Sequence, residues 1–285
     1  MKPIASIARV NEILSKHDLK AKKQFGQNFL IDVNVVINIA ERSILNSDSL
    51  VIEIGPGLGS LSEQLASRCR KLVAFEIDPN MVNILSDTMQ NYPNFNLIFQ
   101  DFLTANLDDV LKEHRLNNEP VYICANLPYY ITTPILFKIF ESGSDIALIS
   151  VMMQKEVADR LVANKNTKDY NALSIIVQYL YDVKVIVKVS KNVFIPKPQV
   201  ESSVVQFIKK EKNPNVTDEK TFFEIVKACF KQRRKTLYNN LRDYLNDSEK
   251  AKQLLFDLGY LNSTRAQELE IDDFIKIYKE LTKCE

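Results

Sequence analysis

The stretch Leu50-Val51-Ile52-Glu53-Ile54-Gly55-Pro56-Gly57-Leu58-Gly59-Ser60 decides the fold. Residues 50–54 form a short and nearly continuous apolar run, which is typical of a buried strand in a parallel sheet. The three glycines that follow allow a sharp turn and let the backbone come close to a ligand. Ser60 and the leucines after it predict a helix whose N-terminus faces that ligand. A turn with a purely structural role is the alternative.

The glycine spacing indicates the kind of ligand. A dinucleotide-binding turn has the pattern G-x-G-x-x-G, whereas this turn has G-x-G-x-G. Pro56 also removes one backbone N–H from the loop, which weakens a phosphate-binding site. The turn therefore favours a nucleoside ligand without phosphates, such as S-adenosylmethionine, over the cofactor of a nicotinamide dehydrogenase.

Two further strand ends carry acidic side chains. The run 71–76 reads as the next strand, and its last residue, Glu76, follows Gly55 by about twenty residues, the spacing at which a carboxylate binds a ribose diol. A third strand is predicted over 95–99, and Asp101 comes just after it. Its carboxylate could accept a hydrogen bond from the adenine amine of the cofactor.

The rest of the chain predicts an α/β protein. Apolar runs predict strands at 50–54, 71–76, 95–99, 121–125 and 146–152, with helices between them. Such alternation is typical of a doubly wound parallel sheet that binds ligands outside the carboxyl ends of its strands. The alternating segments 183–189 and 204–208 predict an antiparallel hairpin at one edge. The polar stretch 209–220 reads as a linker to a small all-helical domain.

Composition excludes several classes of protein. The chain has 285 residues, 46% of them hydrophobic and 26% charged, as in an ordinary soluble protein with one large and one small domain. No run approaches the length of a membrane span, and no signal peptide is evident, so we expect a cytoplasmic protein. Four scattered cysteines and two histidines argue against disulfides and against a metal site.

The stretch Asn126-Leu127-Pro128-Tyr129 ends a predicted strand and suits methylation of the exocyclic amine of adenine. The lone pair of that amine is delocalised into the ring, so the amine is a poor nucleophile. Hydrogen bonds from the amine to the Asn126 side-chain oxygen and to the carbonyl of Leu127 or Pro128 would free the lone pair. These bonds strengthen as positive charge develops in the transition state. An Asn-Pro turn with core tyrosines is the alternative.

Aromatic side chains are expected to hold the target base. A base must leave its stack before its amine can be reached, and the Tyr129 ring could stack on it, a contact worth about 1–3 kcal/mol. Phe194 precedes a loop with prolines at 196 and 198, and this stiff loop could hold its ring against the other face of the base. Phe194 could equally be a core residue at a strand end.

Four motifs together resemble the ribosomal RNA adenine dimethyltransferases. They are Lys-Lys-x-x-Gly-Gln-Asn-Phe-Leu at 22–30, Glu-Ile-Gly-Pro-Gly at 53–57, Asn-Leu-Pro-Tyr at 126–129 and Phe-Ile-Pro-Lys-Pro-x-Val at 194–200. The resemblance covers nearly the whole chain, including the stretch 230–241, and within the family it is strongest to the bacterial small-subunit enzymes.

The resemblance implies a Rossmann-like methyltransferase domain over 1–209, with an N-terminal helix and lid segment at 1–31, and a helical domain over 217–285 that contributes to rRNA binding. It implies S-adenosylmethionine as methyl donor and dimethylation of two adjacent adenines in the 3′-terminal hairpin of small-subunit rRNA. The expected partner is the 30S subunit or its precursor, and the enzyme is expected to be monomeric. The implied cofactor-binding residues are Asn28, Leu30, Gly55, Glu76, Asp101 and Asn126, of which Asn28 and Leu30 rest on the resemblance alone.

Two features depart from the family. Asn171 stands where many relatives have glycine, and we expect it to keep a left-handed turn. The net charge is only +1, so RNA binding would depend on local clusters. These comprise Lys22, Lys23, Lys231, Arg233, Arg234 and Lys235, and Lys227, Lys231 and Lys235 are spaced to share one helix face. A macrolide-resistance-type enzyme acting on large-subunit rRNA and a catalytically silent ribosome-assembly factor are the alternatives.

Overall fold

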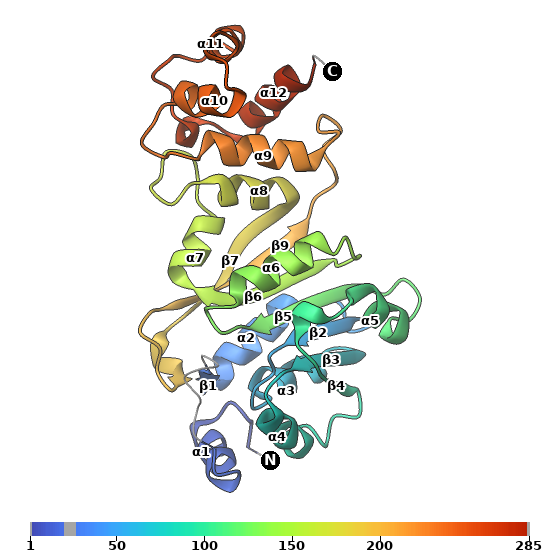
Figure 1. Ribbon diagram of the computed structural model, residues 1–285. Coiled ribbons are helices and arrows are strands. Elements are labelled where there is room, and N and C mark those ends of the chain that lie inside the picture. Colours follow the sequence, from blue (N-terminus) through green and yellow to red (C-terminus); the bar gives the residue numbers. More distant parts are fainter. Residues whose placement is uncertain (1, 20–26, 284–285) are drawn as a thin grey trace. The chain divides into compact units, whose positions relative to one another are not determined.

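The protein is described by a computed structural model that covers residues 2–19 and 27–283 and forms two compact units (Figure 1). One unit combines residues up to 158 with 184–208, and the other combines 159–183 with the chain from 209 onward. The segment 159–183, whose last residues begin a strand of the sheet, groups with the C-terminal helices, whereas the sequence-based division assigned it to the domain over 1–209.

A seven-stranded sheet with the order β4-β3-β2-β5-β6-β9-β7 forms the centre of the first unit (Figure 1). β2, β3, β4, β5 and β6 are parallel, and β9 runs antiparallel to β6. This is the predicted Rossmann-like arrangement with an antiparallel edge. The strands are β2 (Leu50–Ile54), β3 (Lys71–Glu76), β4 (Phe95–Phe99), β5 (Val121–Asn126), β6 (Leu148–Gln154), β7 (Tyr181–Val189) and β9 (Ser202–Lys209).

Helices connect these strands, and an aspartate caps the start of two of them. Asp32 accepts a hydrogen bond from the Val35 N–H at the start of α2, and Asp78 caps α4, whose first residue is Pro79. The helical elements are α1 (Ile7–Lys16), α2 (Val33–Ser43), α3 (Ser60–Ala66), α4 (Pro79–Thr88), η2 (Phe102–Thr104), α5 (Leu107–His114), α6 (Thr132–Glu141), α7 (Lys155–Leu161) and η3 (Lys191–Val193).

The glycine-rich turn has the predicted conformation. Gly55, Gly57 and Gly59 have φ angles of 69°, 58° and 90°, in the left-handed region where a side chain is unfavourable. A Cβ at Gly59 would also lie 3.2 Å from atoms of Thr88 and Met89. The turn lets β2 lead directly into α3, so the start of α3 lies at the carboxyl end of the sheet.

A short two-stranded sheet joins segments that are distant in sequence. β1 (Phe29–Leu30) pairs antiparallel with β8 (Phe194–Ile195), with Leu30 opposite Phe194. The Ile31 N–H also donates to the Val193 carbonyl. The end of the predicted lid segment is therefore attached to the loop that carries Phe194.

The second unit has a helical core that begins earlier than predicted. Tyr179 on α8 lies 4.7 Å, ring centre to ring centre, from Phe222 on α9, and both pack with Phe274 and Tyr278. Its helices are α8 (Ala172–Leu180), α9 (Glu219–Cys229), α10 (Leu237–Leu245), α11 (Ser248–Asp257), η4 (Ala266–Glu268) and α12 (Ile271–Thr282).

The expectation for Asn171 is wrong. Its φ is −157°, so its backbone is extended rather than left-handed. Its side chain accepts a hydrogen bond from the Leu173 N–H, and Ser174 completes a capping box at the start of α8. Asn171 is therefore a helix N-cap, a role that glycine fills less well.

No helix in the described parts of the chain is long and apolar enough to cross a membrane.

Candidate active site

The strand register brings the predicted site residues into one row. Ile54 of β2 lies opposite Phe75 of β3 and Ala125 of β5. The next position on each strand holds Gly55, Glu76 and Asn126, and adjacent strands lie only about 4.8 Å apart. A backbone turn without a side chain thus lies between a carboxylate and an amide at the carboxyl end of the sheet.

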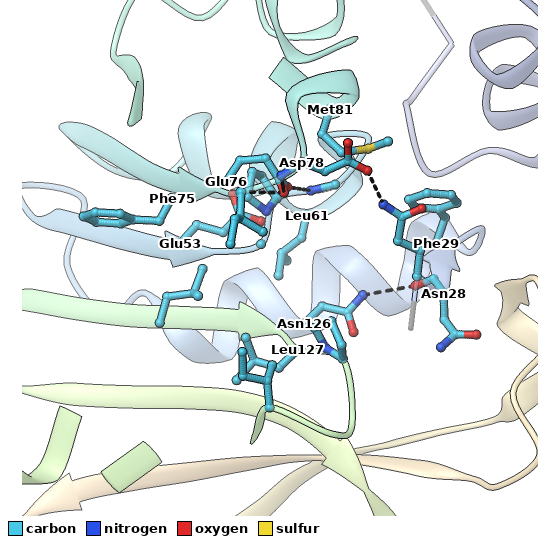
Figure 2. Close-up of a pocket in the computed structure, with 18 of the residues that line it drawn as sticks. Asn28, Phe29, Glu53, Leu61, Phe75, Glu76, Asp78, Met81, Asn126 and Leu127 are labelled. Atoms are coloured by element: carbon cyan, nitrogen blue, oxygen red, sulfur yellow. Dashed lines mark hydrogen bonds between the residues drawn. The ribbon is translucent and has the colours of Figure 1, made fainter. Parts of the chain in front are cut away.

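A cavity that is partly open to solvent lies at this end of the sheet (Figure 2). Predicted cofactor-binding residues and predicted catalytic residues both contribute to its wall. Apolar side chains of α3, α4 and α6 complete it. The predicted residues that line it are Asn28, Leu30, Gly55, Glu76, Asn126, Leu127, Pro128, Tyr129 and Phe194.

Backbone amides orient the Glu76 carboxylate. One oxygen, Oε1, accepts hydrogen bonds of 2.9 Å from the N–H groups of Ile77 and Asp78. The other, Oε2, has only a long contact of 3.4 Å with the Gly57 N–H. Burial raises the pKa of Glu76 above its ordinary value, and the three backbone donors oppose this rise. The carboxylate is thus fixed through one oxygen while the other is only weakly engaged.

The amide of Asn126 is fixed by its donor end. Its Nδ2 donates to the backbone carbonyl of Asn28 at 3.4 Å, the bond that Figure 2 shows as a dashed line. The Asn126 side-chain oxygen accepts no hydrogen bond from any residue that the structure describes. Asn28, which the sequence placed at the site only through the resemblance, thus contacts Asn126 directly.

The turn after Asn126 distinguishes the two candidate carbonyl acceptors. The Pro128 carbonyl already accepts hydrogen bonds from the Ile131 N–H at 3.1 Å and from the Thr132 hydroxyl at 3.2 Å. Within the described chain, no such donor reaches the Leu127 carbonyl. A carbonyl oxygen has two lone pairs, so Leu127 rather than Pro128 has acceptor capacity to spare.

Phe194 is buried and Tyr129 is half-buried, and both line the cavity. Phe194 reaches it from β8, where the pairing with Leu30 holds its backbone. Tyr129 reaches it from the turn between β5 and α6, next to Tyr130, which is 63% exposed. The cavity therefore has aromatic side chains on two separate elements.

The cofactor side contains residues that the sequence interpretation missed. Asp101 is not part of the cavity wall, and one of its carboxylate oxygens, Oδ1, caps η2 by accepting from the Leu103 N–H at 2.9 Å. Gln100 and Phe102, on either side of it, line the cavity instead, together with the half-exposed Ile77. The sequence signal for these three was only their adjacency to Glu76 and Asp101.

Glu53 is a further residue that the sequence interpretation missed. It lies in the cavity wall, is 1% exposed and has a carboxylate oxygen, Oε2, without a hydrogen-bond partner among the described residues. Burial, with a smaller contribution from the nearby Glu76, raises the pKa of Glu53 to about 8. It was visible in the sequence as the one polar residue in the apolar run 50–54.

The predicted RNA-binding cations of the second unit lie in a turn, not on a helix. α9 ends at Cys229 and α10 starts at Leu237, so the expectation that Lys227, Lys231 and Lys235 share one helix face is wrong. We call residues 231–235 the basic turn. Its exposed members include Lys231, Arg233 and Arg234, while Lys235 is half-buried. Lys22 and Lys23 lie outside the described residues.

A buried amide holds the basic turn. Asn240, on α10, is 2% exposed. Its Nδ2 donates to the carbonyls of Cys229 and Gln232 at 2.8 and 3.2 Å, and its Oδ1 accepts from the Gln232 N–H at 3.1 Å. The side chain therefore terminates α9 and fixes the start of the turn from inside the helical core.

The cations in the basic turn differ in their partners. Lys235 lies 3.5 Å from the carboxylate of Asp243, and Arg233 donates to the Thr167 carbonyl at 3.4 Å. Lys231 and Arg234 make no ion pair with any described residue. Within the described chain, no group of three or more histidine, cysteine or acidic side chains is placed to hold a metal ion.

Comparisons with known proteins agree with this geometry. Residues 18–283 match the family described as ribosomal RNA adenine dimethylase. The chain is 46% identical over 279 residues to ribosomal RNA small subunit methyltransferase A of Bacillus cytotoxicus, covering 96% of each chain. A dimethyladenosine transferase structure from Plasmodium falciparum matches with a TM-score of 0.74 and 24% identity, over 89% of this chain and 97% of that one. The 23S rRNA methyltransferase ErmE matches with a TM-score of 0.69 and 25% identity, over 90% and 100%.

Proposed function

The chain belongs to the ribosomal RNA adenine dimethylase family and is an S-adenosylmethionine-dependent rRNA adenine methyltransferase, and on that premise we propose that its substrate is small-subunit (16S) rRNA. We propose that it dimethylates the N6 amines of two adjacent adenines in the 3′-terminal hairpin loop, as a step in small-subunit maturation. The name of the Bacillus cytotoxicus relative, which refers to the small subunit, supports this choice of RNA.

The observation that carries the proposal is the orientation of Asn126. Its amide nitrogen is engaged by the Asn28 carbonyl, which leaves the amide oxygen as an acceptor in the cavity. An acceptor is what an amine substrate requires, because the amine presents N–H donors. The Leu127 carbonyl supplies a second acceptor one residue away, so the two together suit the two N–H groups of an adenine amine.

These two acceptors perform the chemistry that we propose for the chain. As the amine nitrogen forms its new bond, positive charge develops on it and its N–H groups become stronger donors. The bonds to Asn126 and Leu127 therefore strengthen in the transition state more than in the ground state, which is the condition for catalysis. No strong base is required, because the amine proton becomes acidic only after the methyl group arrives.

The residues on the opposite side of the cavity fit a nucleoside cofactor. S-adenosylmethionine, when bound, supplies an electrophilic methyl group. We propose that the weakly engaged Oε2 of Glu76 accepts hydrogen bonds from ribose hydroxyls, and that Gly55 allows close approach at the turn. Asn28 and Leu30 would contact the same ligand from the lid side. Gln100 and Phe102 reach the cavity where the adenine would lie. The Leu103 N–H engages only one carboxylate oxygen of Asp101, and we propose that the other accepts a hydrogen bond from the adenine amine.

Aromatic rings would hold the extruded adenine. Tyr129 and Phe194 line the cavity beside Asn126 and Leu127, and we propose that their rings flank the base. Stacking on such rings is worth about 1–3 kcal/mol per base, which helps to offset the cost of unstacking. Dimethylation also requires room for one methyl group already present on the amine.

Cations are proposed to bind the phosphates of the RNA. In the helical unit these are Lys231, Arg233, Arg234 and Lys235, and Lys22 and Lys23 are proposed to contribute from the N-terminal region. The exposure of the basic turn, with two cations free of ion pairs to described residues, supports this role. We propose that the partner is the 30S subunit or its precursor in the cytoplasm, and that the enzyme acts as a monomer without a metal.

Methyl transfer from labelled S-adenosylmethionine to unmethylated small and large ribosomal subunits tests the proposal, with nucleoside analysis of the product. We expect dimethyladenosine in small-subunit RNA only, and no label with Asn126→Ala as the blank. Label in large-subunit RNA would instead place the enzyme with the macrolide-resistance type. No label in either RNA, with S-adenosylmethionine still bound, would indicate a catalytically silent assembly factor.

A further inference from the structure

The hydroxyl of Tyr129 makes a contact that base stacking does not require. It lies 2.9 Å from the hydroxyl of Ser202, within hydrogen-bond distance. Stacking uses only the face of a ring, so a phenylalanine would serve it equally well. The bond connects the turn after β5 to the first residue of β9, which is 73 residues further along the chain.

Ser202 is a rigid anchor for this bond. It is 1% exposed and lies opposite Gln154 of β6 in the antiparallel ladder. The preceding residue, Glu201, is fixed through two groups, since its carbonyl accepts from the Lys155 N–H and its carboxylate accepts from the Lys191 N–H. The backbone on both sides of the serine hydroxyl is therefore held by the central sheet and by the segment before β8.

Tyr129, in contrast, lies in a short turn outside the central sheet. It is in the three-residue turn between Pro128 and α6, and the next ring, Tyr130, is 63% exposed. A hydrogen bond at the far end of the ring fixes the position of the hydroxyl and so restricts χ1. It also restricts the ring plane, because the O–H bond of a phenol prefers to lie in that plane. Burial raises the pKa of the Tyr129 hydroxyl, so the hydroxyl stays neutral and can donate or accept in this bond.

We propose that Ser202 is a positioning residue for methyl transfer, because its hydroxyl holds the Tyr129 ring in the plane that receives the target adenine beside Asn126. This inference rests on the proposed role of Tyr129 as a stacking platform. Ser202 itself does not line the cavity, so it would act only through the tyrosine.

The test is a double-mutant cycle with Tyr129→Phe, Ser202→Ala and the two combined, assayed by methyl transfer to unmethylated small subunits. Each single variant should lower kcat about threefold to tenfold, the effect of losing one neutral hydrogen bond. The double variant should be no slower than the singles, because all three lack the same bond. The affinity for S-adenosylhomocysteine, measured by calorimetry, should not change.

Ser150→Ala is the matched control. It removes a buried serine hydroxyl from the neighbouring strand β6, and that hydroxyl has no partner among the described residues. Its kcat should equal that of the wild type. If Ser202→Ala disturbs folding of β9, Tyr129→Phe still removes the same bond from the other side without altering the sheet.

Three outcomes would overturn the inference. They are wild-type kcat in both single variants, additive losses in the double variant, and a loss confined to thermal stability. Tyr129→Ala tests the underlying proposal separately. If Tyr129→Ala retained full turnover, the stacking role of Tyr129 would be wrong, whereas a large loss in Tyr129→Ala with additive single variants would refute only the role of Ser202.

Discussion

The cavity at the strand ends and the basic turn of the helical unit hold their functional groups in opposite ways. In the cavity, Glu76 and Asn126 are enclosed, and hydrogen bonds to backbone groups fix their direction. In the basic turn, Lys231 and Arg234 are exposed and make no ion pair with a described residue. The rate of methyl transfer in the cavity should therefore depend on the positions of side chains, and RNA affinity at the basic turn should depend on salt concentration.

Asn126→Ala should have the largest effect and would sharpen this contrast. Loss of one oriented acceptor for the charge developing in the transition state costs a factor of about 10² to 10³ in kcat. RNA affinity and its dependence on salt should stay at wild-type values, because the variant removes no cation. Single-turnover methylation and filter binding at several salt concentrations measure the two quantities. A parallel loss of RNA affinity would contradict a purely catalytic role.

Glu53→Gln should change the pH dependence of stability. The pKa of Glu53 is raised to about 8 in the folded protein, against about 4.3 in an unfolded chain. The folded state therefore binds the extra proton in this window, and the free energy of unfolding falls as pH rises from about 4.5 to 8. Glutamine resembles the neutral acid at every pH, so the variant should avoid that fall.

The measurement for Glu53→Gln is the thermal midpoint of unfolding from pH 5 to pH 9. Near pH 5 the variant and the wild type should have similar free energies of unfolding. As pH rises, that of the variant should exceed that of the wild type by up to a few kcal/mol. If the variant and the wild type had equal thermal midpoints at pH 9, another group would have to stabilise the Glu53 carboxylate, and the expected rise in its pKa would be wrong.

Asn240→Ala would break the simple contrast, because the exposed basic turn depends on a buried side chain. Removing the amide leaves the Cys229 and Gln232 carbonyls without this donor, at a cost of about 1–3 kcal/mol in unfolding free energy. RNA affinity should fall severalfold although no charge is lost. Chemical denaturation and RNA binding are measured on the same samples.

Asn239→Ala is the control for Asn240→Ala, since Asn239 precedes it on α10 and its side chain hydrogen-bonds only to Thr236 among the described residues. It should bind RNA like the wild type. If Asn240→Ala lowered stability but left RNA affinity unchanged, the shape of the basic turn would be irrelevant to binding.

The sequence predicted well those features that depend on neighbours in the chain. The strand over 50–54 and the left-handed glycines after it follow from local sterics. The row formed by Gly55, Glu76 and Asn126 followed as well, because parallel strands end at one edge of the sheet.

The features that the sequence left open depend on partners far along the chain. The spacing of the lysines suggested one continuous helix, but Asn240 terminates α9 from a different helix. The donor end of Asn126 is occupied by Asn28, 98 residues away, and this was invisible in the Asn-Leu-Pro-Tyr motif. Asp101 shows the reverse case, because a local hydrogen bond from the Leu103 N–H engages one of its carboxylate oxygens and the side chain is not part of the cavity wall.

Arg234→Ala should have the smallest effect and tests the electrostatic side of the comparison. Each lost phosphate contact lowers the slope of log affinity against log salt by about 0.7 to 0.9, so RNA binding should weaken a fewfold at low salt and less at high salt. The kcat at saturating substrate should not change, because Arg234 is not part of the cavity. Lys252→Ala is the control, since it removes an exposed cation of α11 outside the basic turn. If both variants lowered the slope equally, RNA would respond to the overall charge of the helical unit rather than to the placement of cations by Asn240.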